Sequence, residues 1–151
     1  FIFPYLSYCI EVWGSASVVH LNSLLKLQKR VCRIISHSDF LADSLPLFKS
    51  LKILTVYDIY QMSLAIFMFR FNKRLLPSIF NTYFTINRRR HSINTRQLNN
   101  FHIPFCRLSL TQKFIKYKCV IFWNNLDLVF KQLNSLPLFK KSFKKHLLSK
   151  Y

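Results

Sequence analysis

The clearest pattern along the chain is a helical repeat of apolar side chains over residues 18–36. Positions three or four residues apart share one side of such a helix: Val18, Leu21, Leu24, Leu25, Gln28, Val31 or Cys32, and Ile35. The basic side chains gather toward the other side: Lys26, Lys29, Arg30 and Arg33. Ser17 can cap the N-terminus of the helix. We therefore predict an amphipathic helix with one buried and one cationic face.

A shorter helix is predicted before it, in the stretch PYLSYCIEVWGSA of residues 4–16. Pro4 suits a first helical turn, and Gly14 is typical of the position just past a helix end. We expect this helix to pack onto the next one through four side chains: Tyr5, Tyr8, Val12 and Trp13.

The next helices are expected over residues 45–53, with Ser44 as the cap, and over residues 56–74. Thr55 can cap the second of these, and Asp58 lies near the positive end of its dipole. The helix of residues 56–74 is apolar on nearly all sides, which is typical of a helix in the middle of a bundle. A short helix should restart at Pro77.

The pattern changes after Phe84. Residues 85–110 are polar and rich in Arg and Asn, which predicts an extended loop with short strand-like pieces, and alternation over residues 114–118 predicts one strand. Ser135 can cap a closing helix with an apolar stripe and an opposite row of lysines: Lys140, Lys141, Lys144 and Lys145. The expected fold is mainly α, with a helical lobe in residues 1–84 and a basic tail segment in residues 85–151.

Charge sharpens this picture, because 23 Lys and Arg stand against 5 Asp and Glu, for a formal net charge of +18. After Leu75 there are 14 basic residues and one acidic residue. Such an excess repels itself in a compact state and favours a polyanionic partner. A/T-rich codons account for part of the lysine excess, but they do not favour Arg, so residues 88–90 indicate anion binding more strongly.

The predicted nucleic-acid contacts combine forked donors and amides with neighbouring aromatic rings. The basic and amide set in the second half is Arg88, Arg89, Arg90, His91, Arg96, Gln97, Asn99, Asn100 and Arg107. The rings that could stack on bases are Phe101, Phe105 and Tyr117. For the rings alone, burial in the core is the simpler interpretation. The lysine row of residues 140–145 could lie on nucleic acid or on anionic lipid.

Catalytic chemistry is not visible in the chain. The five acids include no close pair for two-metal phosphoryl transfer, and one glycine cannot form a phosphate cradle. A zinc site from His91, His102, Cys106 and Cys119 is disfavoured by the ligand separations. We therefore expect no catalytic residue, no metal and no cofactor in this chain.

The scattered cysteines are typical of reduced thiols, so we expect an intracellular protein of the nucleus or cytoplasm. No transmembrane span is expected, because the apolar run of residues 64–69 is followed at once by Arg70.

Taken in order, six segments resemble the region downstream of the polymerase core in non-LTR (LINE, jockey-like) retrotransposon reverse transcriptases. The segments are FIFPYLSYCIEVWGSA, LLKLQKRVCRIIS, PLFKSLKILTVYDIYQMSLAIFMFRF, RRRHSINTRQLNNFHIP, YKCVIFWNNL and FKKSFKKHLLSKY. The likeness covers almost the whole chain. The chain departs from the family pattern where Cys9 and Cys119 replace a usual Gly and Asp127 replaces a usual Pro.

The resemblance implies a thumb-and-tail fragment of an RNA-directed DNA polymerase, a transposable-element protein that grips template–primer or element RNA. The paired aspartates of the palm, which hold Mg²⁺ in the family, would lie upstream of Phe1 in a missing N-terminal domain. We expect this chain to be inactive alone and to bind RNA, an RNA–DNA hybrid or DNA. The alternatives are a basic amphipathic membrane-surface protein and a translated retroelement relic without function.

Overall fold

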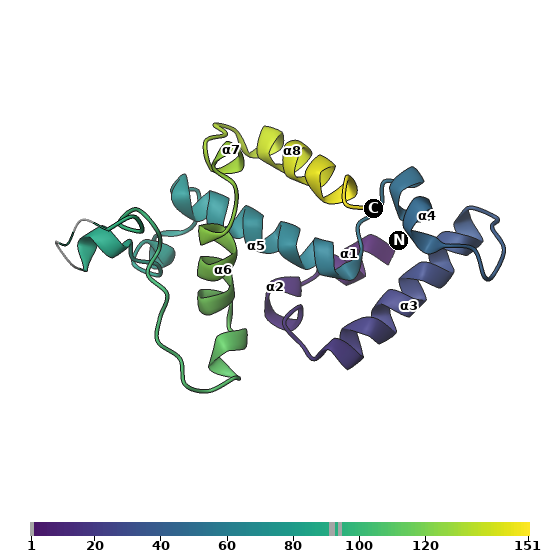
Figure 1. The fold of residues 1–151 in the computed structure, drawn as a ribbon, viewed down its shortest axis with the longest axis horizontal. Coiled ribbons are helices and arrows are strands. Elements are labelled where there is room, and N and C mark those ends of the chain that lie inside the picture. Colours follow the sequence, from purple (N-terminus) through teal and green to yellow (C-terminus); the bar gives the residue numbers. More distant parts are fainter. Residues whose placement is uncertain (1, 91–92, 94) are drawn as a thin grey trace. The chain divides into compact units, whose positions relative to one another are not determined.

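The computed structural model describes residues 2–90, 93 and 95–151, and this part of the chain is mainly helical, as predicted (Figure 1). The described residues contain eight α-helices, which are connected by turns, by 3₁₀ segments and by a long, mostly irregular segment between α5 and α6. They are α1 (Ile2–Ser7), α2 (Ile10–Trp13), α3 (Val18–Ile35), α4 (Ser44–Ser50), α5 (Val56–Asn72), α6 (Ile115–Asn124), α7 (Leu128–Lys131) and α8 (Leu136–Leu148). The 3₁₀ segments are η1 (Ser78–Phe80), η2 (Asn87–Arg89) and η3 (Thr111–Lys113).

The chain forms two compact units. Unit 1 contains the described residues up to Ser63 together with Pro137–Tyr151, and unit 2 is Leu64–Leu136. The division falls inside α5, so it differs from the expected lobes of residues 1–84 and 85–151, which stay a prediction. The closing helix α8 belongs almost entirely to unit 1.

In unit 1, α3 begins at the predicted residue, ends one residue earlier than predicted, and lies beside α4 (Figure 1). Gln28, on the buried side of α3, is only 6% exposed. Its Nε2 donates to the Leu54 carbonyl at 3.3 Å, and its Oε1 accepts from the Val56 N–H at 2.8 Å. A buried amide with both ends paired costs little, because each lost hydrogen bond to water is replaced. Gln28 thereby fixes α3 against the start of α5.

The cap of α4 lies one residue earlier than predicted. Asp43, not Ser44, is the N-cap, and its carboxylate accepts from the Leu45 N–H at 3.3 Å. Ser44 is the first helical residue and is buried. A carboxylate at the positive end of the helix also gains from the helix dipole. The predicted Thr55 cap is confirmed, because the Asp58 N–H donates to Thr55 Oγ1 at 3.3 Å.

The first predicted helix is broken in two, and the predicted packing of Tyr5, Tyr8 and Val12 is wrong, whereas Trp13 is half-buried. Cys9 has a left-handed backbone with φ 49°, which separates α1 from α2 and shifts their helical phase. Tyr5, Tyr8 and Val12 are consequently 83%, 77% and 76% exposed, whereas Ile10 is buried. Gly14 ends α2 with φ −66°, so close packing rather than left-handed backbone requires glycine there. A Cβ at this position would overlap the ring of Tyr60.

In unit 2, the predicted strand of residues 114–118 is wrong, because this segment begins α6. The buried side chains of α6 follow helical spacing: Cys119, Val120 and Trp123. The alternation before them was too short to distinguish a strand from the first turn of this helix. Within the described residues, the strand-like pieces reduce to one isolated antiparallel bridge between Ile86 and Phe101.

An aromatic cluster forms the core of unit 2 around this bridge. The rings meet edge to face, as in the Phe71–Phe84 pair, whose centroids are 4.8 Å apart. The other members are Phe67, Phe80, Tyr83 and Phe101. The cluster anchors the irregular segment after residue 84 on the second half of α5.

Candidate nucleic-acid interface

The strongest candidate interface is residues 85–102, which we call the arginine loop. Its two ends run antiparallel and are joined by backbone hydrogen bonds. The N–H groups of Asn87, Arg88 and His102 donate to the carbonyls of Asn100, Leu98 and Thr85 at 3.0, 3.0 and 2.7 Å. The Asn87 side chain adds a bond to the Gln97 carbonyl at 3.0 Å. Hydrogen bonds between its two ends therefore hold the base of the loop in place.

Asn124, the last residue of α6, fastens this base. Its Nδ2 donates to the Phe101 carbonyl at 2.8 Å, and its Oδ1 accepts from the Phe101 N–H at 3.0 Å. Lys131 donates in turn to the Asn124 carbonyl at 3.1 Å. Burial lowers the pKa of Lys131, and the nearby Asp127 opposes this shift. The amide pair and the buried Phe101 ring together hold the loop on α6 and on the aromatic cluster.

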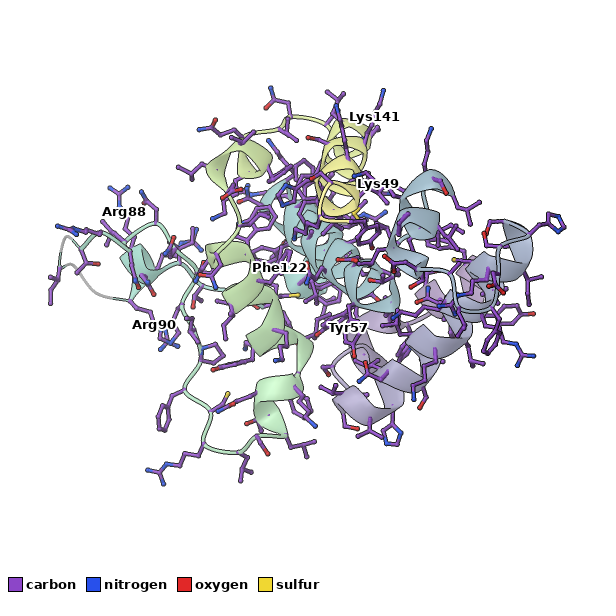
Figure 2. All side chains as sticks on the ribbon, turned by 45° about the vertical axis from the view of Figure 1, so that its right-hand side comes forward. Lys49, Tyr57, Arg88, Arg90, Phe122 and Lys141 are labelled. Atoms are coloured by element: carbon purple, nitrogen blue, oxygen red, sulfur yellow. The ribbon has the colours of Figure 1, made fainter. Side chains whose placement is uncertain are left out.

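The predicted arginines of this loop are all exposed: Arg88, Arg89, Arg90 and Arg96. Arg88 and Arg90 extend outward from the loop in Figure 2. Arg88 to Arg90 lie in and just after η2, so consecutive side chains project in different directions from one tight turn. His91 was also predicted to contribute, but it lies outside the described residues. The loop thus exposes several guanidinium groups to a polyanion, and hydrogen bonds hold the backbone at its base.

On α3 the four predicted cations share one face, as their spacing requires. Lys26 and Arg30 are exposed, whereas Lys29 and Arg33 are half-buried. Arg33 has a structural role as well, because its Nε donates to the Ala42 carbonyl at 2.9 Å. Lys26 and Arg30 are therefore the members of this row that are most available to phosphate.

On α8 the predicted lysine row lies opposite the buried side chains Phe139, Phe143 and Leu147. Lys141, Lys144 and Lys145 are exposed, and Lys140 is half-buried. Figure 2 shows Lys141 extending from the helix. The row is thus a largely solvated cationic face, opposite the buried side of the same helix.

The three predicted stacking rings have different environments. Phe101 is 6% exposed and belongs to the aromatic cluster, as the simpler interpretation expected. Tyr117 is half-buried in α6. Phe105 is 85% exposed, and the guanidinium of Arg107 lies over its ring at 5.8 Å from the centroid. Only Phe105 presents a ring that is largely open to solvent.

Sequence reasoning missed a cation near this region. Lys116 lies over the Tyr83 ring at 5.1 Å from its centroid, a cation–π arrangement. Burial raises the pKa of the Tyr83 hydroxyl above its ordinary value. A helix predicted over residues 115–118, in place of the expected strand, would have indicated this position of Lys116.

Other chemistry is not evident in the described part of the chain. It contains no group of three or more His, Cys, Asp or Glu side chains placed to hold a metal ion. All four cysteines are among the described residues and none is in a disulfide, and burial raises the pKa of Cys32. Among the described helices, none is both long enough and apolar enough to span a membrane.

Comparison with known proteins finds no matching family model, no similar curated protein and no similar solved structure. Geometry and charge are therefore the basis for the candidate interface.

Proposed function

We propose that the chain binds nucleic acid, and that it corresponds to the region after the polymerase core of a non-LTR retrotransposon reverse transcriptase. In that role it would hold template–primer or element RNA, without catalytic residues of its own. The observation that carries the proposal is the arginine loop, whose fixed base presents exposed arginines. Guanidinium groups suit this task because their forked donors match phosphate oxygens.

The charge around the loop supports the same function. Unit 2 contains twelve Lys and Arg but only one acid, Asp127. No Asp or Glu occurs between Asp58 and Asp127. Few internal counter-charges are available to the arginines, so a bound polyanion would relieve their mutual repulsion.

The backbone at two positions supports the family part of the proposal. Cys9 has φ 49°, a conformation that the family's usual Gly adopts without steric cost. Asp127 has φ −58°, which is close to the fixed value of the family's usual Pro. At both positions the chain departs from the family residue but keeps a backbone that suits it.

A matched pair of triple variants tests the nucleic-acid role. Arg88, Arg89 and Arg90→Gln should weaken RNA binding and reduce the magnitude of its salt slope by about 2 to 3. The control, Lys52, Arg70 and Lys150→Gln, removes the same charge from exposed positions outside the predicted site. Equal losses in both variants would show that the loop has no special part in binding.

The membrane-surface alternative makes the opposite prediction. The lysine row of α8 could attract anionic lipid, but the apolar side of this helix is buried and cannot insert. Vesicle flotation separates the two functions. Strong binding to anionic vesicles together with negligible RNA binding would favour the alternative.

The family assignment has a separate test in the source genome. An open reading frame that runs into the codon for Phe1 and encodes the paired palm aspartates would support it. Stop codons directly upstream would instead favour a retroelement relic.

A further inference from the structure

Phe105 is the most exposed large apolar side chain in the described part of the chain, at 85%. It lies in the non-helical connection between the arginine loop and η3. Phe101, four residues earlier, is packed into the aromatic cluster. Full burial of a Phe side chain is worth about 1.5–3 kcal/mol, so the fold gains little from Phe105 in this position. Its exposure leaves the ring accessible to a partner.

The segment around Phe105 is held in place by its own hydrogen bonds. Gln112 Nε2 donates to the Cys106 carbonyl at 3.1 Å, and Thr111 Oγ1 donates to the Leu108 carbonyl at 2.7 Å. Cys106 is half-buried, whereas the residues on both sides of it are exposed. Phe105 and Arg107 thus flank an anchored residue, and the guanidinium lies over the ring. The pair lies on an irregular segment that is anchored at the Cys106 carbonyl.

This arrangement matches the chemistry of an unpaired nucleotide. An aromatic ring can stack on the face of any base, and a neighbouring guanidinium can pair with phosphate. Base pairing and stacking in a duplex hide the faces that the ring would need. We propose that Phe105 and Arg107 form a stacking site for one unpaired nucleotide, which rests on the proposed nucleic-acid binding and specifies single-stranded substrate at this position.

The charge of the surroundings favours this occupant. Lys113 follows in η3 and is exposed, and Lys116 is exposed on the first turn of α6. The acid-free stretch between Asp58 and Asp127 includes the whole segment. A protein partner that buries Phe105 would have to neutralise these cations, whereas a nucleotide strand supplies a phosphate for each base.

The test uses the full chain, fluorescein-labelled oligouridine, and a duplex RNA with the same number of phosphates. Phe105→Ala should weaken oligouridine binding by about 5- to 150-fold, the range of one lost base stack. Duplex affinity should change little, and the salt slope should stay the same because no charge is removed. Phe105→Tyr should retain wild-type affinity. Phe40→Ala, which removes a 72%-exposed Phe from unit 1, is the matched control and should leave both affinities unchanged.

Distinct outcomes would overturn the inference. Equal oligouridine affinity in Phe105→Ala and wild type, with salt-dependent binding intact, would reject the stacking site and leave the proposed function standing. Absence of RNA binding by the wild-type chain would reject both. Binding to anionic vesicles that requires Phe105, with RNA affinity unaffected, would assign the ring to a lipid surface. Circular dichroism of each variant checks that the helices are retained.

Discussion

Among the residues that the structure describes, four non-glycine residues have a left-handed backbone: Cys9, His37, Lys52 and Arg74. Three of them follow the ends of α3, α4 and α5, where the next N–H bonds back to the helix, as from Ser38 to the Arg33 carbonyl at 3.0 Å. Glycine is the usual residue at this position. The only glycine of the chain, Gly14, is needed elsewhere because Tyr60 packs against it. The left-handed backbone at these four residues has a steric cost, which substitution by glycine would remove.

Replacing Cys9 by Gly is expected to raise the free energy of unfolding by about 1 kcal/mol, because the left-handed penalty disappears. The change is measured by urea denaturation at constant m-value. Lys26→Gly, in the interior of α3, is the control and should lower stability by about 1 kcal/mol. A Cys9→Gly variant that is destabilised as much as this control would contradict the backbone account.

The second prediction concerns the pKa of the Tyr151 hydroxyl. Its hydroxyl donates to Asp58 and accepts from the Thr55 N–H at 3.0 Å, and its ring meets Phe48 edge to face. Burial, followed by the Asp58 bond, raises the pKa of Tyr151 from 10.0 to about 12. The neutral hydroxyl therefore stabilises the fold fully below pH 10, and this contribution is lost as the pH rises through 12.

Tyr151→Phe should accordingly lower the free energy of unfolding by about 1.5–3 kcal/mol at neutral pH, the value of a hydrogen bond to a charged group. The difference between the two proteins should shrink between pH 10 and pH 12. Denaturation of both proteins across this range measures it. A difference that stays constant with pH would contradict the bonded, raised-pKa hydroxyl.

At the scale of elements, long periodic segments such as α3 were predictable, whereas the break between α1 and α2 and the start of α6 were not. The apolar spacing of α3 covers five turns, so its signal exceeds local noise, and Ser17 marks its start. The break between α1 and α2 depends on the left-handed backbone of one residue, Cys9. A glycine at this position would have indicated the break, but a cysteine does not. The start of α6 alternates for only a few residues, and its helical nature depends on tertiary burial of Cys119 and Trp123.

The charged residues of the candidate site were predictable from the sequence, but the burial or exposure of its aromatic rings was not. The arginines of the loop stand out by composition alone, and they are exposed as charged side chains normally are. Phe101 and Phe105 have similar neighbours in the sequence. Their opposite environments follow from the Asn124 bonds to Phe101, a contact over 23 residues that no local pattern reveals.

Asn124 therefore yields the element-scale prediction. Asn124→Ala removes both bonds to the Phe101 backbone and should lower the stability of unit 2 by about 1–3 kcal/mol. Amide hydrogen exchange of Phe101 should become faster, because its N–H loses its acceptor. Asn125→Ala, an exposed neighbour, is the control and should leave the exchange unchanged. Unchanged Phe101 exchange in Asn124→Ala would show that Asn124 does not fasten the arginine loop.

Across the whole molecule, both units are cationic. Unit 1 contains eleven Lys and Arg against four acids, for a net +7, and unit 2 has a net +11. Each unit has its own core, so the charge is spread over the surfaces of two folded bodies. Each phosphate that a Lys or Arg of either unit neutralises releases counterions from the nucleic acid. If cations outside the arginine loop also bind, the affinity should therefore depend on salt more steeply than contact with the loop alone allows.

The most direct test of the account is the affinity of the full chain for RNA as a function of salt. We predict that the logarithm of the association constant falls linearly with the logarithm of the salt concentration, by about 0.7 for each phosphate of a single strand that the protein neutralises. Fluorescence anisotropy with labelled oligouridine provides the measurement. A slope that corresponds to several phosphates would agree with the proposed nucleic-acid binding, whereas affinity that is indifferent to salt would contradict it.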